Sequence, residues 1–300
     1  MMPALIFHPI YSQLDLPERH RFPIEKYQGI ADALNRLNPE IMYERPDEIS
    51  EHLLTEFFQA DYVQQFLTNQ LPPQAMRRIG FPWSEQLVRR TRTAVGGTLL
   101  TAKRALEQGI ALNLTGGYHH AFADFGSGFC IFNDLYLAAR HMLTQPGVDR
   151  VLIVDCDVHQ GDGTAALAAN DNDVFTLSLH GEKNFPYRKQ ISDLDFALQS
   201  GCEDDEYLTT LEQALHLAFM QSGADAVIYD AGVDIHVDDD LGLLNITTQG
   251  VLCRDQLVIN TCRKHGVPVA SVIGGGYQRD IDALVKVHLQ LFFAAGVKVL

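Results

Sequence analysis

Residues 151–163 read Val-Leu-Ile-Val-Asp-Cys-Asp-Val-His-Gln-Gly-Asp-Gly, an apolar run of strand length that ends in three carboxylates and an imidazole. An unpaired charge is costly to bury, so aspartates at the end of a buried strand need a reason. Because alternate side chains of an extended chain point the same way, we expect Asp155, Asp157 and His159 on one face, within reach of a single cation. Asp-Gly pairs are also ordinary turn signals, so the rest of the chain has to decide between a turn and a metal site.

The composition is that of a globular protein with an acidic surface. The chain has 300 residues, of which 46% are hydrophobic, and a formal net charge of −15. This length suits one large domain, and we expect a single domain over residues 1–300. The charge argues against direct nucleic-acid binding and against attraction to anionic membranes. It favours a cationic substrate, such as a lysine side chain or a polyamine.

The cysteines and the apolar runs predict a cytoplasmic protein. The five cysteines are scattered, odd in number and without a Cys-X-X-Cys pair, which is typical of reduced thiols. The first residues lack a basic region followed by a long apolar one, so no signal peptide is expected. No apolar run reaches the about 18 residues of a membrane span. The sequence does not indicate an oligomeric state.

Strand-like and helix-like segments alternate along the chain. Hydrophobic periodicity and capping residues predict strands at 4–7, 110–114, 151–155, 174–179, 226–229 and 267–273. They predict helices at 24–37, 50–58, 61–67, 84–108, 132–143, 164–169, 204–221, 248–264 and 280–295, with loops at 69–83 and 180–203. This alternation is typical of an α/β fold with an open parallel sheet flanked by helices. The pair Gly96-Gly97 inside a long helix predicts close packing against a neighbour.

Polar clusters follow four of the predicted strands. They are Thr-Gly-Gly-Tyr-His-His at 115–120, the cluster at 155–162, Asp-Ala-Gly-Val-Asp at 230–234 and Gly-Gly-Gly-Tyr at 274–277. Each alone is a weak signal, since histidine pairs are often surface residues and glycine runs are often turns. Ligands of an open parallel sheet bind beyond the carboxyl ends of its strands, so the four clusters predict one site at one edge.

The residue types in these clusters suit a metal-dependent amide or ester hydrolase. Asp157, His159 and Asp234 can supply the two oxygens and one nitrogen of a catalytic zinc site that keeps an open position. His119 and His120 are candidates for the general base, and Asp155 and Asp162 are candidates to orient them. Tyr277 on its glycine loop can donate a hydrogen bond to a developing oxyanion.

In order and spacing, these motifs resemble the histone deacetylase family of the arginase–deacetylase superfamily. The resemblance is carried by residues 116–121, 126–134, 155–163, 230–234 and 274–277. Residues 78–84, Arg-Ile-Gly-Phe-Pro-Trp-Ser, together with Gly96-Gly97, resemble the class IV branch and its bacterial relatives. The resemblance implies an arginase–deacetylase fold and hydrolysis of a lysine that carries an acetyl or a longer fatty acyl group, or of a related acylated amine.

The resemblance also implies roles for individual residues. Asp157, His159 and Asp234 would bind one zinc ion, with ferrous iron as an alternative, and Tyr277 would polarise the acyl carbonyl. His119 and His120 would form the tandem pair, backed by Asp155 and Asp162. Phe129 and Phe185 would wall the substrate tunnel, although core packing explains Phe185 equally well. A structural potassium ion would contact residues at five positions, namely Asp155, Asp157, His159, Ser178 and Leu179.

Two departures and two rival interpretations remain. Gly80 stands where many relatives have a rim aspartate that grips a peptide backbone, so peptide specificity is an open question. Gln160 replaces a second histidine, and we expect little effect on the chemistry. Arginase-type enzymes need extra carboxylates for a second manganese, and Gly161 and Gly232 occupy those positions here. A non-catalytic acyl-lysine-binding scaffold is the other rival. Measurements of metal content and turnover would distinguish this scaffold from an amide hydrolase. The substrate of such a hydrolase would be an acyl-lysine, an acetylpolyamine or a small acyl-amine.

Overall fold

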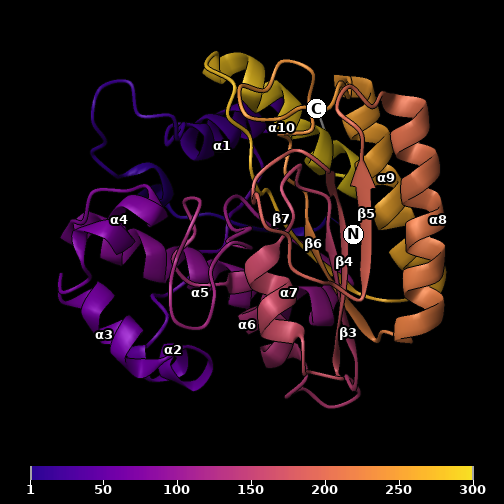
Figure 1. Cartoon of the computed structure of the whole chain (residues 1–300). Helices are drawn as coiled ribbons and strands as arrows, with labels where there is room; N and C mark the ends of the chain where they lie inside the picture. Colours follow the sequence, from indigo (N-terminus) through magenta and orange to yellow (C-terminus); the bar gives the residue numbers. More distant parts are fainter. Residues whose placement is uncertain (1, 299–300) are drawn as a thin grey trace.

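The computed structural model describes residues 2–298. Within them lies a parallel sheet of seven strands (Figure 1). Its order is β1-β2-β7-β6-β3-β4-β5, and every pairing is parallel. The strands are β1 (Ala4–Ile6), β2 (Ile110–Asn113), β3 (Val151–Asp155), β4 (Val174–Gly181), β5 (Leu194–Leu198), β6 (Ala226–Asp230) and β7 (Val269–Val272). The expected open α/β sheet is therefore confirmed.

Helices cover both faces of this sheet. α5 (Glu85–Gln108) and α6 (Asp134–Met142) pack on one face, and α8 (Asp204–Ser222) and α9 (Thr248–His265) lie on the other (Figure 1). α10 (Ile281–Ala295) packs against α9 and against α1 (Lys26–Leu37). The remaining helices are short: η1 (Pro9–Ser12), α2 (Glu51–Phe57), α3 (Ala60–Leu67), α4 (Pro73–Ile79) and α7 (Asp162–Ala168). Among residues 2–298, no helix combines the length and the hydropathy that crossing a bilayer requires.

The central strand β3 explains why residues 151–155 read as an unbroken apolar run. Leu152 and Val154 belong to the hydrophobic cluster that includes α8 and α9, whereas Val151 and Ile153 belong to the cluster under α6. A strand that is buried on both faces needs apolar side chains at every position. The first carboxylate, Asp155, therefore comes only at its last residue.

The glycine pair inside α5 lets the helix approach its neighbours, as expected. A methyl group at Gly96 would overlap the carbonyl oxygen of Asp47, and one at Gly97 would overlap the hydroxyl of Tyr11. The long helix begins at the cap Ser84, whose side chain accepts a hydrogen bond from the backbone N–H of Leu87.

Three local predictions were wrong. The expected loop 69–83 contains α4, which begins at Pro73 and ends at Ile79, and the capping residue Gly80 has a positive φ of 92°. The expected loop 180–203 contains β5, a short edge strand with the sequence Leu-Asp-Phe-Ala-Leu. Exposed and partly buried residues alternate along most of it, and such a strand depends on its partner β4. Asp61, expected to cap a helix, lies inside the first turn of α3, and Gln59 is the cap.

Candidate active site

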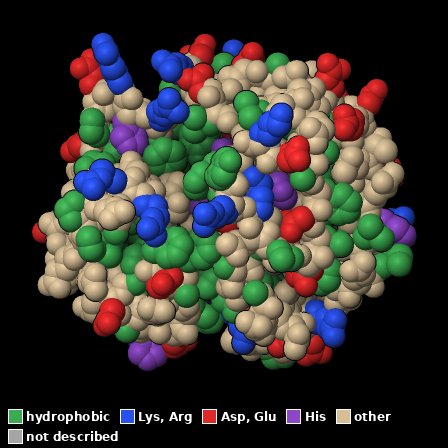
Figure 2. Space-filling view, in the orientation of Figure 1, with side chains coloured by type: hydrophobic (Ala, Val, Ile, Leu, Met, Phe, Trp, Pro, Cys, Tyr) green, Lys and Arg blue, Asp and Glu red, His purple; other side chains and the backbone are tan. Residues whose placement is uncertain are grey.

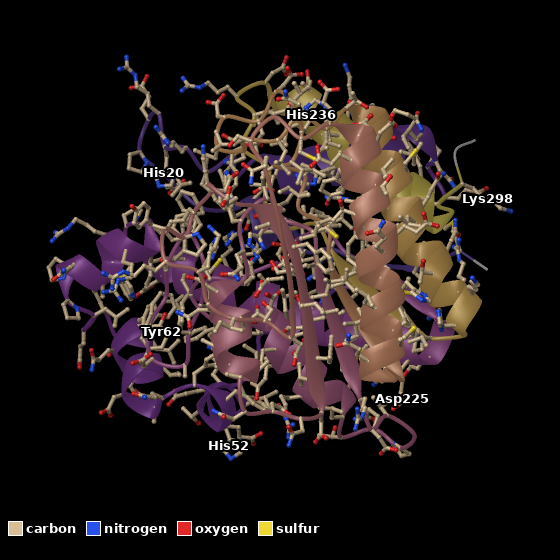
Figure 3. All side chains as sticks on the ribbon, turned by 45° about the vertical axis from the view of Figure 1, so that its right-hand side comes forward. His20, His52, Tyr62, Asp225, His236 and Lys298 are labelled. Atoms are coloured by element: carbon tan, nitrogen blue, oxygen red, sulfur yellow. The ribbon has the colours of Figure 1, made fainter. Side chains whose placement is uncertain are left out.

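The four polar clusters meet beyond neighbouring strands. They follow β2, β7, β6 and β3, which are adjacent in that order within the sheet. Figure 3 shows His20 and His236 at this end of the molecule, whereas Asp225, which precedes β6, lies at the other end. The structure thus brings the sequence-predicted residues to one edge of the sheet.

Asp157, His159 and Asp234 form a buried group whose ligand atoms all lie within 4.8 Å of one another. His159 Nδ1 lies 2.9 Å from Asp157 Oδ1 and 3.1 Å from Asp234 Oδ2. The backbone fits closely around them, because a methyl group at Gly275 would overlap Asp234 Oδ2. Two carboxylates and one imidazole are the donor set of a catalytic zinc site with an open position. The residues present therefore fit such an ion.

Asp155 does not share a face with Asp157 and His159, contrary to the simple strand alternation. β3 ends at Asp155, and the chain then turns, with the N–H of Asp157 donating to Asp155 Oδ1 at 3.1 Å. The other oxygen, Asp155 Oδ2, lies 2.8 Å from His119 Nδ1. The turn thus divides the carboxylates between the metal-ligand group and the histidine pair.

Burial and mutual charge push the pKa values of the ligand group apart. Burial opposes ionisation of Asp157, but His119 and His159 hold the pKa of its carboxyl well below the usual range. Burial and the charge of Asp157 raise the pKa of Asp234. Burial disfavours the charged ring of His159, yet hydrogen bonds with the two carboxyls raise its pKa to about 10. A metal ion must therefore displace a proton from this group.

His119 and His120 lie side by side, with ring centroids 4.1 Å apart. Each histidine is hydrogen-bonded to a carboxylate through Nδ1. The distance is 2.6 Å between His120 and Asp162 Oδ1, and 2.8 Å between His119 and Asp155 Oδ2. Burial alone would lower the pKa of His119, but the charges of Asp155 and Asp157 raise it well above its ordinary value. Burial and the charge of His119 lower the pKa of His120 to about 4. Without a metal ion, these shifts favour an imidazolium at His119 beside a neutral imidazole at His120.

This difference predicts the pH dependence of turnover. A base must be unprotonated to act, so kcat/KM should rise as the pH increases through about 4, the pKa of His120, and then stay level. Burial and the nearby carboxylates raise the pKa of Tyr277 well above 10, so its hydroxyl should not limit activity below pH 10. The test is a pH profile of kcat/KM with metal content measured at each point. An acid limb centred above pH 6.5 at constant metal content would contradict this assignment.

Asp239 and Lys26 hold Tyr277 and its glycine loop in place. Its backbone N–H donates to Asp239 Oδ2 at 2.7 Å. The buried ammonium of Lys26 donates to the carbonyl oxygens of Gly274 at 3.1 Å and Gly276 at 3.4 Å, and lies 5.7 Å from the Tyr277 ring centroid. These contacts fix the glycine loop and keep the Tyr277 ring beside the ligand group, with its centroid 6.3 Å from that of His159.

A tunnel of about 520 Å³ leads from the surface to this group. His120, His159 and Tyr277 line its inner part, and Phe129 and Phe185 line its sides. Phe185 is 45% exposed and stands edge-on to His120 with ring centroids 4.8 Å apart, which places it at the tunnel and not in the core. The two phenylalanines therefore lie where a linear apolar side chain would pass.

The residues expected around a potassium ion come from the end of β3, the turn that follows it and the neighbouring strand β4. Ser178 is the register partner of Asp155 in the neighbouring strand β4, and Leu179 follows it. The side chain of Ser178 is hydrogen-bonded to His180 Nδ1 at 2.9 Å. The potassium site stays a prediction.

Sequence reasoning gave no role to three residues that support the site. Asp230 is fully buried beside His119, and neither of its carboxyl oxygens has a hydrogen-bond partner within residues 2–298. Burial and the charge of Asp155 raise its pKa well above the ordinary value. Lys26 and Asp239 hold the Tyr277 loop. A lysine within the apolar face of the helix at 24–37 was a signal for Lys26, whereas no sequence signal distinguishes Asp239 from its neighbours Asp238 and Asp240.

Comparisons with known proteins agree with this geometry. Residues 20–291 match a family profile described as "Histone deacetylase domain". The chain is 48% identical over 296 residues to an uncharacterized protein of Picosynechococcus sp., and the alignment covers 97% of each chain.

Two named relatives share lower identity. The chain is 38% identical over 209 residues to Histone deacetylase 2 of Arabidopsis thaliana, covering 69% of this chain and 54% of that protein. It is 34% identical over 203 residues to Histone deacetylase 8 of Xenopus laevis, covering 61% of this chain and 59% of that protein. The alignments thus span little more than half the length of these two relatives.

Proposed function

The chain belongs to the histone deacetylase family, and on that premise we propose that it is a metal-dependent hydrolase that removes acyl groups from lysine side chains. The observation that carries the proposal is the ligand group of Asp157, His159 and Asp234, whose His159 lines the same tunnel as His120 and Tyr277. The sheet is continuous from β1 near the start of the chain to β7 near its end, which supports a single catalytic domain over residues 1–300.

The residues of the chain divide the work of amide hydrolysis. Asp162 holds His120 through Nδ1, so Nε2 is free to accept a proton from the attacking water. His119, kept as an imidazolium by Asp155, places positive charge beside the reacting carbon. The Tyr277 hydroxyl donates a hydrogen bond to the carbonyl oxygen as negative charge develops there. The histidine pair then returns a proton to the leaving nitrogen, and the products are a carboxylate and an amine.

We propose zinc as the resident ion, with ferrous iron as the alternative, and a potassium ion beside Asp155 and Ser178. A bound divalent ion would act as a Lewis acid on the acyl carbonyl and lower the pKa of a neighbouring water. The donor set of two carboxylates and one imidazole supports this choice.

The space behind the ligand group favours a short acyl chain. The inner cavity measures about 20 Å³, room for about one water molecule. Its walls include the rings of Phe22, Tyr27 and Tyr118 and the backbone of Gly117 and Gly274. An acetyl methyl group fits there, whereas a long fatty chain requires these aromatic rings to move.

A turnover panel tests the proposed function and the acyl length together. Zinc-loaded protein is given an acetyl-lysine peptide, a myristoyl-lysine peptide and an acetylpolyamine. We expect cleavage of the acetyl-lysine peptide with kcat/KM at least about tenfold above that of the myristoyl peptide, because the inner cavity is small. His120→Ala, which removes the base, should abolish cleavage.

Each outcome of this panel has a distinct meaning. Faster cleavage of the myristoyl peptide would contradict the short-chain assignment and leave the hydrolase intact. Cleavage of acetylpolyamine and of neither peptide would show that the substrate is an acylated polyamine and not an acyl-lysine. Absence of turnover, with one zinc bound per chain, would favour the non-catalytic acyl-lysine-binding scaffold.

A further inference from the structure

The mouth of the tunnel carries a charge opposite to that of the whole chain. The formal net charge is −15, with 38 acidic residues against 23 lysines and arginines. The charged side chains that line the tunnel outside its catalytic floor are nevertheless cations, Arg78 and Lys183, and no carboxylate lines it within the described residues 2–298. Figure 2 shows several Lys and Arg side chains gathered around an apolar hollow on this face. The local field at the entrance is therefore expected to be positive, because nearby exposed charges act within about 8 Å at physiological salt.

Both cations are held at the entrance by the fold. Arg78 lies in the last turn of α4, and its guanidinium lies 4.7 Å from the ring centroid of Phe125. The segment that carries the tunnel-lining residue Phe129 is hydrogen-bonded to this turn, because the N–H of Gly128 donates to the carbonyl oxygen of Arg78 at 3.2 Å. Across residues 2–298, none of the ion pairs found involves Arg78 or Lys183. Their charges are thus available to a ligand.

Lys183 belongs to a loop that is folded around another ammonium group. Lys189 Nζ donates to the carbonyl oxygens of Glu182, Asn184 and Pro186, at 3.2, 2.7 and 2.8 Å. The Asn184 side chain donates to the carbonyl oxygen of Leu241 at 2.9 Å and so fixes this loop against the opposite rim. Lys183 is exposed between these anchors, next to the tunnel wall formed by Phe185.

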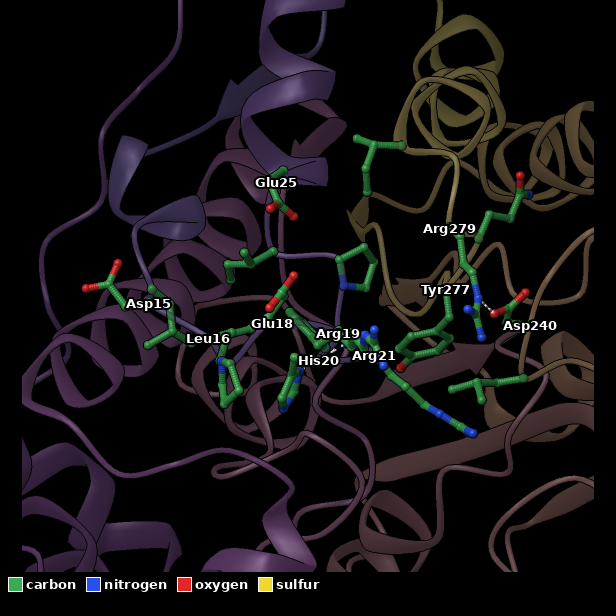
Figure 4. A pocket seen from close by; sticks show the side chains of 18 residues that line it. Asp15, Leu16, Glu18, Arg19, His20, Arg21, Glu25, Asp240, Tyr277 and Arg279 are labelled. Atoms are coloured by element: carbon green, nitrogen blue, oxygen red, sulfur yellow. Dashed lines mark hydrogen bonds and ion pairs between the residues drawn. The ribbon is translucent and has the colours of Figure 1, made fainter.

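A second hollow, of about 910 Å³, adjoins the tunnel and shares Tyr277 and Leu241 with it. Figure 4 shows Arg19 and Arg21 on the side nearer Tyr277, whereas Asp15 and Glu18 lie on the far side. Arg279 is paired with Asp240 in this hollow, but Arg19 and Arg21 take part in none of the ion pairs found between residues 2 and 298. This hollow is also lined by Asp15, Glu18 and Glu25, so its charge is mixed, and the excess of cations is confined to the lining of the tunnel.

The rim position that would carry a carboxylate is closed to any side chain. Gly80 has a φ of 92°, and a methyl group there would lie 2.9 Å from Phe129 Cε1. Its carbonyl oxygen is also hydrogen-bonded to His20 Nε2 at 2.9 Å. A polyamine needs carboxylates along its length, and among residues 2–298 none lines the tunnel itself.

From these observations we infer that the entrance selects an acyl-lysine whose neighbouring residues are acidic. This inference rests on the proposed deacylase function and narrows its substrate class. Arg78 and Lys183 flank the tunnel through which the acyl-lysine enters, so carboxylates one to three residues away in the substrate come within range of their charges. The net charge of −15 repels an acidic segment from the molecule as a whole, so the two cations give the mouth a local attraction that the whole chain does not have.

The test compares three acetyl-lysine peptides of equal length, flanked by glutamate, by alanine or by lysine. For the zinc-loaded wild-type protein at about 50 mM salt, kcat/KM for the glutamate-flanked peptide should exceed that of the lysine-flanked one by about tenfold. The preference should shrink at about 500 mM salt, because the Debye length falls below about 5 Å. Lys183→Glu should lower the ratio of kcat/KM for the glutamate-flanked peptide to that for the lysine-flanked peptide at least about threefold. Arg78→Glu, made as a separate variant, should also lower this ratio.

Lys103→Glu is the matched control, because this exposed lysine of α5 lines a hollow with Val148, Asp225 and Pro268, residues that precede strands at the opposite edge of the sheet. It makes the same charge change and should leave the ratio unchanged. Equal turnover of all three peptides, or preference for the lysine-flanked one, would overturn the inference while leaving the deacylase intact. An equal fall of the ratio in the control would assign the effect to net charge and would also overturn it. Failure of the alanine-flanked peptide to turn over would instead count against the proposed function.

Discussion

Replacing Asp234 by asparagine should remove the divalent ion and lower turnover at least about 10³-fold. Asp234 supplies one of the two carboxylates of the ligand group, and its Oδ2 lies 3.1 Å from His159 Nδ1. An asparagine side chain is neutral and directs an N–H₂ group at one of these positions, so it loses both charge and a ligand oxygen. The remaining pair, Asp157 and His159, cannot complete a three-ligand site.

Metal content per chain, measured after dialysis, is the readout for this variant. Asp238→Asn makes the same chemical change four residues away on an exposed side chain, and should keep both metal and activity. A thermal melt without metal checks that Asp234→Asn is folded, since the N–H of Val158 donates to the Asp234 oxygen Oδ1 at 2.8 Å and helps to hold the turn after β3. One zinc per folded chain in Asp234→Asn would remove Asp234 from the ligand assignment.

Tyr277→Phe should lower kcat by about 10²- to 10³-fold, equivalent to about 2.7–4 kcal/mol of transition-state stabilisation. The phenol is the proposed oxyanion donor, and Lys26 and Asp239 contact the ring and the backbone N–H of Tyr277. Because Tyr277 is outside the ligand group, metal content should stay at the wild-type level. KM should change much less than kcat, since the lost hydrogen bond forms mainly with the developing oxyanion.

Single-turnover rates and metal content together test this assignment. Tyr187→Phe, which removes a hydroxyl from a fully exposed ring of the loop that also carries Phe185, should behave as the wild type. Wild-type kcat in Tyr277→Phe would exclude the hydroxyl from the reaction. A parallel loss of metal would show that the glycine loop had shifted and that the phenol supports the site by packing.

The sequence determined most of the fold because its elements are locally encoded. The unbroken apolar run at 151–155 can be stable only as a strand buried on both faces, and the caps Ser84 and Gly109 fix the two ends of α5. The placement of polar clusters after four strands also located the site, since parallel strands bring their carboxyl ends to one edge. The edge strand β5 and the short helix α4 were missed, because their sequences favour these states only in contact with β4 and with the Phe129 wall.

The tertiary structure alone decided how the polar residues divide their work. Strand alternation predicted that Asp155 shares a face with Asp157 and His159. Because the chain turns after β3, Asp155 is instead hydrogen-bonded to His119, whereas Asp157 and His159 form a group with Asp234. The pKa differences within the histidine pair arise from burial and from charges brought together from separate strands.

The charge at the tunnel mouth was likewise decided in three dimensions. The net charge of −15 follows from composition and predicts attraction of cations. The entrance nevertheless gathers Arg78 and Lys183 from segments more than 100 residues apart, with no carboxylate lining it among residues 2–298. Sequence determines which charges a chain carries, whereas only folding sets the distances between them, and electrostatic energy depends on those distances and on the local solvent.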